Sequence, residues 1–417
     1  MRLAAVSAAI LAAGITTLVQ AGGEAWAGDA LTKPSRHWRA GAKSDGGGIR
    51  LGGFLTYLAA DIATTYVDNL FATDEALVAD VVAQARMAAE VESDWRSHGL
   101  AFRGVALGKA HTMTSSEDTV DYRASVDGFI DILPGTKVGG MASYAREHED
   151  RASPNDARGS EPTPVDHVRA QVDAEQQFAS LGLSFAASYE DLDFQDADFF
   201  GIATINNDDR DRTLWSGSAR LRYDGGGRLR PFVHAAYDTT DYAAARDDNG
   251  FARDSDALEG AVGAELALGR ATSGLIAIGY RRQDFEDARL GTVSGLTLQG
   301  RLDTDLGRSS RMELIVGREL RETTVPGASG FFETAADMRF KHRLLPKLHV
   351  NLTAGYARND FRGIDRIDEV YRAGAGLEYA LSGYARFRAQ YEFTTRESSA
   401  DADFTLNRVT SGLRLRF

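Results

Sequence analysis

The chain has 417 residues, no cysteine, 43 glycines and an excess of acidic over basic residues that gives a net charge of −13. Without cysteine it has no disulfide scaffold, thiolate metal site or thiol nucleophile. Its acidity argues against a general nucleic-acid binder, because nucleic acids are polyanions. Apolar residues make up 43% of the chain, which excludes a disordered protein.

The N-terminus has the pattern of a secretory signal peptide. Arg2 precedes an Ala-rich apolar stretch at residues 3–19, and Ala25–Ala27 fits the small-x-small rule for cleavage. A single membrane anchor is the alternative, but the stretch is barely as long as the roughly 20 residues that a span requires. We therefore predict three parts: a cleaved signal peptide (1–27), a short periplasmic segment (28–48) and one folded unit (49–417).

From residue 49 onward the sequence alternates between apolar and polar residues. Between Val120 and Ile132, for example, the even positions are apolar or Gly, while the odd positions include Asp121, Arg123 and Asp127. A period of two predicts strands with one apolar and one polar face. The expected number is eighteen, with sixteen left open, at approximately 49–66, 77–93, 97–108, 118–132, 136–148, 165–179, 181–192, 209–223, 228–238, 254–268, 271–284, 288–305, 309–320, 331–343, 346–358, 366–380, 382–395 and 402–417.

One segment permits two interpretations. Residues 74–92 have a composition that suits an amphipathic helix. The same residues place apolar side chains at every second position from Leu77 to Val91, which favours a strand. We predict the strand.

The connections between the predicted strands alternate between short turns and longer acidic loops. This alternation is typical of outer-membrane barrels, which have short periplasmic turns and long extracellular loops. The strands are long enough to cross a membrane at a tilt, and the chain ends on an alternating strand with Phe417. A C-terminal aromatic residue is similar to the signal read by the barrel-insertion machinery. We predict an all-β, antiparallel, up-and-down transmembrane barrel in the outer membrane of a Gram-negative bacterium, wide enough for an aqueous channel.

The first predicted strand carries a family resemblance. Gly53 and Phe54 open this strand, and Asp68-Asn69 with Phe71 follow it. This pattern resembles the opening of the second "putative beta-barrel porin" family of outer-membrane proteins. The resemblance implies a barrel whose relatives are often linked to the production and export of exopolysaccharide. We interpret Asp68-Asn69 as a plain turn in preference to a ligand site.

Charge is distributed unevenly along the predicted barrel. Three long loops, at 147–161, 190–211 and 238–256, together carry a charge of −14, so the rest of the chain is nearly neutral. In the predicted topology all three face the outside. The short-turn end is basic, and a field of this kind attracts counter-ions. The candidate periplasmic basic rim consists of Arg222, Arg228, Arg230, Arg343, Arg414 and Arg416.

The polar strand faces supply candidate lumen residues. Basic candidates lie on the late strands, and acidic candidates lie on other strands across the predicted lumen. They would either create a transverse field or form local salt bridges, and we favour the salt bridges. The candidates are Arg372, Arg386, Arg388, Arg408, Asp80, Glu90, Asp121, Asp127, Glu259 and Glu265.

These features predict an outer-membrane channel for hydrophilic solutes and leave open a conduit for exopolysaccharide export. The alternative is a non-conducting structural or adhesive barrel that works through its acidic extracellular loops. The eight histidines are scattered and no nucleophile motif is present, so we expect no enzyme activity, catalytic residue, cofactor or metal site. The expected partners are outer-membrane lipid and lipopolysaccharide, the insertion machinery and components of polysaccharide export, but no nucleic acid.

Overall fold

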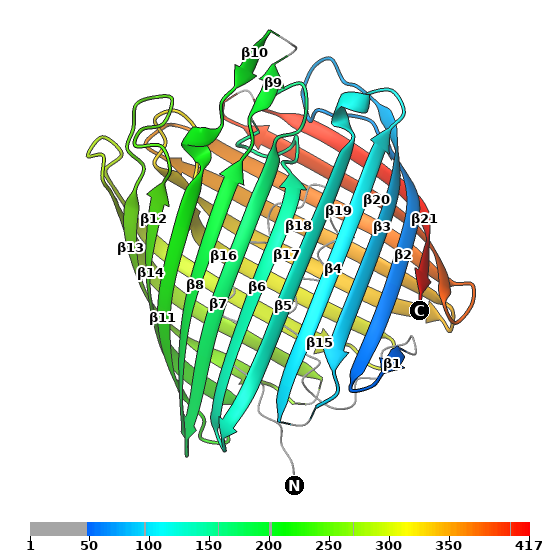
Figure 1. Ribbon diagram of the computed structural model, residues 1–417, viewed down its shortest axis with the longest axis vertical. Coiled ribbons are helices and arrows are strands. Elements are labelled where there is room, and N and C mark those ends of the chain that lie inside the picture. Colours follow the sequence, from blue (N-terminus) through cyan, green and yellow to red (C-terminus); the bar gives the residue numbers. More distant parts are fainter. Residues whose placement is uncertain (1–47, 96, 157, 200–201, 270, 401) are drawn as a thin grey trace.

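The computed structural model describes residues 48–95, 97–156, 158–199, 202–269, 271–400 and 402–417. The predicted signal peptide and almost all of the predicted segment 28–48 lie outside these residues. The described residues form an antiparallel barrel of long tilted strands (Figure 1). Two short 3-10 turns, Ser115–Glu117 and Asp208–Arg210, lie in its long loops. No helix in the described part of the chain has the length and hydrophobicity needed to cross a membrane.

Eighteen of the strands build the barrel wall. The first seven are β2 (Phe54–Val67), β3 (Asp80–Ser93), β4 (His98–His111), β5 (Thr119–Leu133), β6 (Thr136–His148), β7 (Pro164–Phe178) and β8 (Leu181–Phe194). The remaining eleven are β11 (Arg212–Tyr223), β12 (Leu229–Tyr242), β13 (Ser255–Ala267), β14 (Thr272–Phe285), β15 (Thr292–Asp305), β16 (Ser310–Arg321), β17 (Gly330–Leu345), β18 (Leu348–Arg362), β19 (Ile367–Ala380), β20 (Ala385–Ser398) and β21 (Phe404–Arg416).

Three short strands lie outside the wall. β1 (Ile49–Leu51) pairs with the beginning of β2, and β9 (Ala197–Phe199) with β10 (Ala203–Ile205) forms a hairpin within the loop between β8 and β11. This hairpin projects beyond the barrel at the end that carries the long loops (Figure 1).

The barrel closes between its first and last wall strands. β2 pairs with β21 from Ala59–Arg416 to Val67–Arg408. The backbone N–H of Phe417 donates to the carbonyl of Leu58 at 2.9 Å, so the C-terminal residue takes part in the closure. A closed barrel leaves no strand edge along this seam, which satisfies the backbone inside a membrane.

All eighteen predicted wall strands are present, so the alternative of sixteen is excluded. The ambiguous segment 74–92 forms a strand from Asp80 onward, as predicted. The largest differences are at strand ends: β12 continues to Tyr242, four residues past the predicted limit, because it stays paired with β11 up to that residue. The β9–β10 hairpin lies within a segment that the sequence predicts to be a loop.

The outer face of the wall is apolar and carries aromatic side chains near its long-loop end. Exposed residues there include Tyr66, Tyr122, Tyr144, Trp215 and Tyr237. An outward apolar band with aromatic girdles is the pattern of a membrane-spanning barrel. We therefore place the long loops outside the cell and the short turns in the periplasm.

Several girdle tyrosines share one geometry. The hydroxyl of Tyr237 donates to Asp256, one strand over and closer to the outside, at 2.6 Å. The same diagonal hydrogen bond joins Tyr144 to Asp166 at 2.6 Å and Tyr356 to Glu369 at 2.8 Å. A tyrosine at the interface keeps its ring in lipid and its hydroxyl in the polar layer, and these carboxylates mark where that layer begins.

Candidate functional site

The inner face of the wall is polar and encloses a cavity of about 710 Å³. Residues from almost every wall strand line it, because the side chains opposite the lipid-facing ones point inward on each strand. Its outer end is covered by loops that contact one another. We call the described residues of five of them the cap: 112–118, 149–163, 195–211, 243–254 and 322–329.

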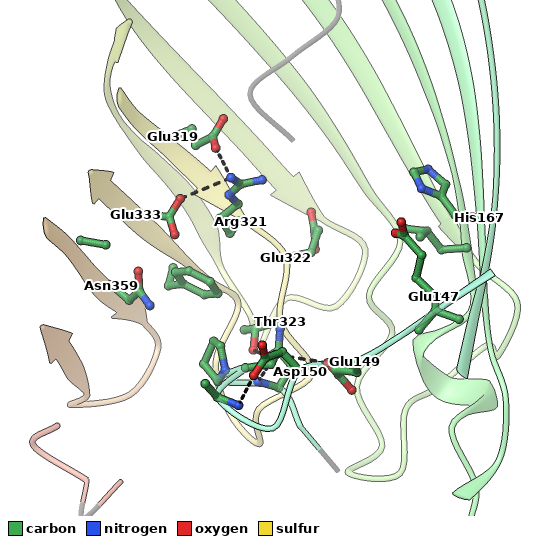
Figure 2. Close-up of a pocket in the computed structure, with 18 of the residues that line it drawn as sticks. Glu147, Glu149, Asp150, His167, Glu319, Arg321, Glu322, Thr323, Glu333 and Asn359 are labelled. Carbon is green, nitrogen blue, oxygen red and sulfur yellow. Dashed lines mark hydrogen bonds and ion pairs between the residues drawn. The ribbon is translucent and has the colours of Figure 1, made fainter. Parts of the chain in front are cut away.

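The loop at residues 149–163, the crossing loop, extends across the mouth of the barrel. It joins β6 to β7, yet Asn155 accepts a hydrogen bond from the hydroxyl of Thr323 at 2.7 Å. Thr323 lies in the β16–β17 loop, and the order of the strands places this loop almost opposite β6 and β7 on the barrel. Figure 2 labels Thr323 of the β16–β17 loop together with Glu149 and Asp150 of the crossing loop. The crossing loop therefore narrows the lumen.

Two buried arginines fasten the crossing loop at its sides. Arg151 donates to Glu117 in the β4–β5 loop through two nitrogens, with Nε–Oε2 at 3.0 Å. Arg210 of the β8–β11 loop donates to Glu149 at 2.8 and 3.0 Å. All four side chains are at most 8% exposed. Paired guanidinium and carboxylate groups with two hydrogen bonds have a well-defined geometry, so they fix the position of the loop.

A third acidic group of the crossing loop is buried beside this arrangement. The carboxylate of Asp156 lies 3.5 Å from Arg151. Burial raises the pKa of Asp156 to about 6, and this effect exceeds the opposing attraction of Arg151. The crossing loop therefore contains a carboxyl group that titrates near neutral pH.

The crossing loop also makes an apolar contact with the wall. Ala152 packs on a buried cluster at the outer ends of β2, β3 and β21, and its carbonyl accepts a hydrogen bond from Arg396 of β20 at 3.1 Å. The members of the cluster are Val67, Ala72, Val82, Phe404 and Leu406. The crossing loop thus contacts the wall on this side too.

Arg253 links two further loops of the cap. Its side chain is 1% exposed and pairs with Asp247 at 2.6 Å within the β12–β13 loop. The same guanidinium donates to the carbonyls of Thr323 and Ala328 in the β16–β17 loop, at 2.7 and 3.0 Å. Because Thr323 also holds Asn155, one chain of contacts joins three loops over the cavity.

Beneath the cap the cavity is lined by charges of both signs. Figure 2 shows Arg321 between Glu319 and Glu333 on one wall, with His167 and Glu147 on the facing wall. Arg321 lies 2.5 Å from Glu319 and 3.3 Å from Glu333. The lining therefore alternates in sign over short distances and does not form one uniform field.

All four candidate lumen arginines lie on inward-facing strand positions, and each has a nearby acidic partner. The first three pair with Asp337 or Glu378, which the sequence analysis did not single out, and the fourth reaches the crossing loop. The pairs are Arg372–Asp337 at 3.1 Å, Arg386–Glu378 at 2.5 Å, Arg388–Glu378 at 2.9 Å and Arg408–Asp150 at 3.9 Å.

The six acidic candidates also face inward, and they too have local partners. Glu90 and Asp127 both contact Arg103, Asp121 contacts His148 at 2.7 Å, Glu259 accepts from Thr297 at 2.8 Å, and Glu265 lies 3.4 Å from Arg222. Asp80 instead accepts backbone hydrogen bonds from residues 112–114, so it holds a turn of the cap. The contacts between strands join strands that are adjacent or one strand apart, and they do not span the lumen.

Only some of the residues predicted for the basic periplasmic rim are exposed there. Arg222 and Arg414 are buried in the inner wall, where they pair with Glu175 and Asp61. Both residues occupy inward-facing strand positions, and neighbouring inward side chains bury them. Arg228 lies in the β11–β12 turn and Arg343 near the periplasmic end of β17, while Arg230 pairs with Asp224 and Arg416 is the last residue of β21.

The motif residues of the predicted family lie at both ends of β2. Asn69 is fully buried and donates to the carbonyls of Thr73 and Thr405, at 2.6 and 2.9 Å. Asp68 accepts from the backbone and side chain of Asn407 on β21. Gly53 precedes Phe54 at the start of β2, and Phe71 lies in the turn that Asn69 organises. The motif therefore fastens the first loop to the last strand.

The segment 147–161 lies at the outer end of the barrel with the other acidic loops, as predicted. Its fold over the lumen is a feature that the sequence does not predict. Glu149, Asp150 and Asp156 find arginine partners there, so their charge does not require exposure to solvent. A signal was present in Arg151, a basic residue inside an acidic loop, although its partner Glu117 is 34 residues away.

Comparisons with known proteins agree with this architecture. The model of the family described as "Putative beta-barrel porin 2" matches residues 44–417. None of the curated proteins matches the chain. The solved structures that match include three from Pseudomonas aeruginosa. OccK2 (OpdF) is 12% identical, with 87% of this chain and 98% of that chain covered and a TM-score of 0.48. The outer membrane protein OpdK is 12% identical, with 87% and 99% of the two chains covered and a TM-score of 0.44, and OpdL is 13% identical, with 88% and 100% covered and a TM-score of 0.43.

At these identities and TM-scores, no conclusion about this chain is drawn from the three structures. The family match covers most of the chain and includes the entire barrel. The protein therefore belongs to the "Putative beta-barrel porin 2" family of outer-membrane barrels.

Proposed function

We propose that this protein is an outer-membrane channel for small hydrophilic solutes, and that the crossing loop limits what passes. One observation carries the proposal: the crossing loop spans the mouth of a polar lumen and is held at the far side by the hydrogen bond between Thr323 and Asn155. A loop folded into a barrel reduces its cross-section without interrupting the wall. The narrowed barrel then acts on the size and charge of solutes.

The cavity beneath the cap supports a limit on solute size. Its volume of about 710 Å³ lies in the range of small-molecule sites, roughly 300–1,000 Å³. The alternating charges of Glu319, Arg321 and Glu333 offer hydrogen bonds to neutral polar molecules and favour neither cations nor anions strongly. We expect uncharged solutes of about the size of a sugar to pass.

Liposome swelling tests this proposal with a series of neutral sugars of increasing size. Proteoliposomes that carry the refolded barrel should swell in the smaller sugars and lose this response as sugar size increases. Liposomes that carry heat-denatured protein are the control. A correctly folded barrel that produces no swelling with any sugar would contradict the proposal.

Export of an exopolysaccharide is a narrower form of the same proposal, and the family resemblance supports it. A polymer would have to pass the same cap, so the cap contacts would have to open. Addition of an anionic oligosaccharide to the periplasmic side of a planar bilayer tests this form. Interruptions of the ionic current that depend on the side of addition would support it, and an undisturbed current would count against it.

A structural or adhesive barrel is the competing function, and the interlocked cap favours it. Arg253 joins two loops over the lumen, and a cap that never opens would leave a closed cylinder. Under this alternative the acidic extracellular loops would be the working surface, among them the β8–β11 loop that carries the β9–β10 hairpin. The swelling assay separates the two functions, because a closed cylinder admits no sugar.

The proposal assigns transport to the lumen and no chemical reaction. His148, which lies between two glutamates in the sequence, is held by Asp121 at 2.7 Å at the outer end of β6. Such a contact can fix the end of a strand as well as activate a base.

We also propose that Phe417 serves insertion into the outer membrane and that lipopolysaccharide surrounds the outer girdle.

A further inference from the structure

The ladder between β15 and β16 stops before either strand ends. It contains eight residue pairs, from Asp305–Arg311 to Leu298–Arg318, whereas β14–β15 contains thirteen and β16–β17 twelve. The same register would next pair Thr297 with Glu319, Leu296 with Leu320 and Gly295 with Arg321. All six of these residues belong to strands, but the ladder does not include them. The wall therefore has a gap at the outer end of this seam.

The cavity reaches into this gap. Leu298, Arg318 and Leu320 occupy membrane-facing positions: Leu298 pairs with the exposed Ile278, and it also pairs with Arg318 across the seam. All three nevertheless line the lumen cavity. Elsewhere along the strands the lining consists of inward-facing residues, apart from His148 at the end of β6. The cavity thus extends between β15 and β16 toward the membrane.

The outer end of the β16–β17 hairpin is displaced inward at the gap. Gly330, Phe331, Phe332 and Glu333 are all buried, although alternation would expose every second one. The ring of Phe332 lies against the inner side of β15, where a Cβ on Gly295 would come within 2.7 Å of its Cζ. Phe332 therefore fills the inner side of the gap, and Gly295 provides the space.

Arginine side chains replace part of the missing ladder. Nε of Arg318 donates to the carbonyl of Leu296 at 3.2 Å, which satisfies a backbone oxygen that lacks a strand partner. Arg318 and Arg362 lie over the Phe332 ring, at 4.6 and 5.3 Å from its centroid. Arg318 forms no ion pair with any residue that the structure describes, whereas Arg362 pairs with Asp360. The gap thus presents, beside leucines, a guanidinium that has no carboxylate in direct contact, although Asp360 attracts it from farther away.

The height of the gap matches the membrane interface. Leu296 pairs with Tyr280, a girdle tyrosine whose hydroxyl contacts Ser294. Leu296 itself is 58% exposed on the lipid-facing side. Unpaired backbone is costly in the hydrocarbon layer and less costly at this level, where water and headgroups are present. A gap here opens toward the headgroups and upper acyl chains of the outer leaflet.

We propose that this gap is a lateral portal between the lumen and the outer leaflet, and that it takes an amphipathic anion, an acyl chain with an anionic head. Leu296, Leu298 and Leu320 would contact the chain, and Arg318 would bind the head. Phe332 closes the portal until the outer end of the hairpin moves. The portal is separate from solute passage along the barrel axis.

The absence of native cysteine allows a direct test with a fluorescent thiol label. A label at Thr297→Cys, on the lumen side of the gap, is compared with one at Ala261→Cys. Ala261 also lines the cavity, and it lies at the same height through Gly279. In vesicles whose lipids carry a nitroxide high on the acyl chain, we expect quenching at position 297 and none at 261. Equal quenching at both positions, or none at either, would overturn the proposal.

A lock across the gap tests the ligand class. Leu296→Cys with Leu320→Cys, joined by a short bifunctional thiol cross-linker, is expected to lose the binding of spin-labelled dodecanoate that the same variant shows before cross-linking. Val262→Cys with Ile278→Cys, a paired rung on the lipid face, is the control and should leave binding intact. Binding that survives the lock, or that disappears equally in the control, would overturn the proposal.

Ion conductance of the same locked barrels separates this proposal from the proposed function. We expect cross-linking to leave the axial conductance of this double variant at its value before cross-linking. A barrel without conductance that still shows selective quenching at position 297 would contradict the channel and retain the portal. A conducting barrel without selective quenching would contradict the portal alone.

Discussion

Arg151 and Arg210 are single residues on which the position of the crossing loop depends. Each places its charge against a glutamate from a different loop, in surroundings from which water is largely excluded. Removal of one partner from a buried ion pair costs about 3–5 kcal/mol, because the remaining charge is left without compensation. The contacts of the cap therefore depend strongly on these two side chains.

We predict that Arg151→Ala loosens the crossing loop and raises single-channel conductance, because Glu117 would be left buried and unpaired. Arg246→Ala is the matched control, since Arg246 is 64% exposed and its pair with Asp287 spans 3.7 Å. An exposed pair of this kind contributes about 0–1 kcal/mol. Native conductance in both variants would show that the Arg151 contact does not hold the loop.

Asp156 makes the position of the crossing loop sensitive to pH. Its pKa is about 6 in the docked loop, because burial outweighs Arg151, and the ordinary value is 3.8. The docked state therefore binds a proton more tightly. The resulting stabilisation is complete below about pH 3.8 and is lost as the pH rises through about 6.

We predict that conductance falls when the pH is lowered from neutral to below about 6, because protonated Asp156 favours the docked loop. Bilayer recordings over this range measure the effect. In Asp156→Asn the loop carries no titrating group at this position, so this part of the pH response should disappear. A pH response identical to that of the native protein in the variant would assign it to other groups.

At the scale of elements, the turn after β2 connects the first loop to the last strand. Asn69 makes three hydrogen bonds to backbone groups, and one of them reaches Thr405 on β21. An unpaired buried polar group costs about 1–3 kcal/mol. The turn thus stabilises the seam at which the barrel closes.

We predict that Asn69→Ala lowers the free energy of unfolding by about 1–3 kcal/mol, because the fully buried Asn69 amide and its three backbone hydrogen bonds are lost. Urea unfolding of the barrel in lipid vesicles measures this change. Asn206→Ala, in an exposed stretch of the β8–β11 loop, is the control and should have little effect. Equal stability of the two variants would contradict the structural role of Asn69.

The strands and their partners differ in how well the sequence predicts them. Alternation such as that between Val120 and Ile132 predicts the strands well, because a membrane and a wet lumen impose opposite polarity on neighbouring residues. The ion pairs are harder to predict from the sequence, because the strand register decides that Arg372 meets Asp337, 35 residues earlier. The sequence predicts which way an inward residue points, and it does not identify the partner.

The crossing loop and the gap between β15 and β16 could not be predicted in the same way. An acidic loop is equally compatible with solvent and with an arginine-lined interior, so the composition of residues 149–163 does not determine its course. The residues beside the gap, Leu296 and Leu320, alternate like those of any paired strand. Only the three-dimensional arrangement shows that they do not meet.

At the scale of the whole molecule, the barrel is a rigid wall whose outer opening is set by loops. The wall is continuous around the cylinder except at the β15–β16 gap, and the cap contacts join loops from five connections. This separation of roles implies that the opening can change while the wall stays folded. It also implies that a shortened crossing loop should leave the barrel intact.

The most direct test compares the native barrel with a variant in which residues 151–160 are replaced by a short Gly-Ser linker, both recorded in planar bilayers. We predict that both form steady channels, that the variant has the larger conductance, and that it admits larger sugars in liposome swelling. Unchanged conductance in a correctly folded variant would show that the crossing loop does not limit the lumen. Absence of current in both would contradict the channel itself.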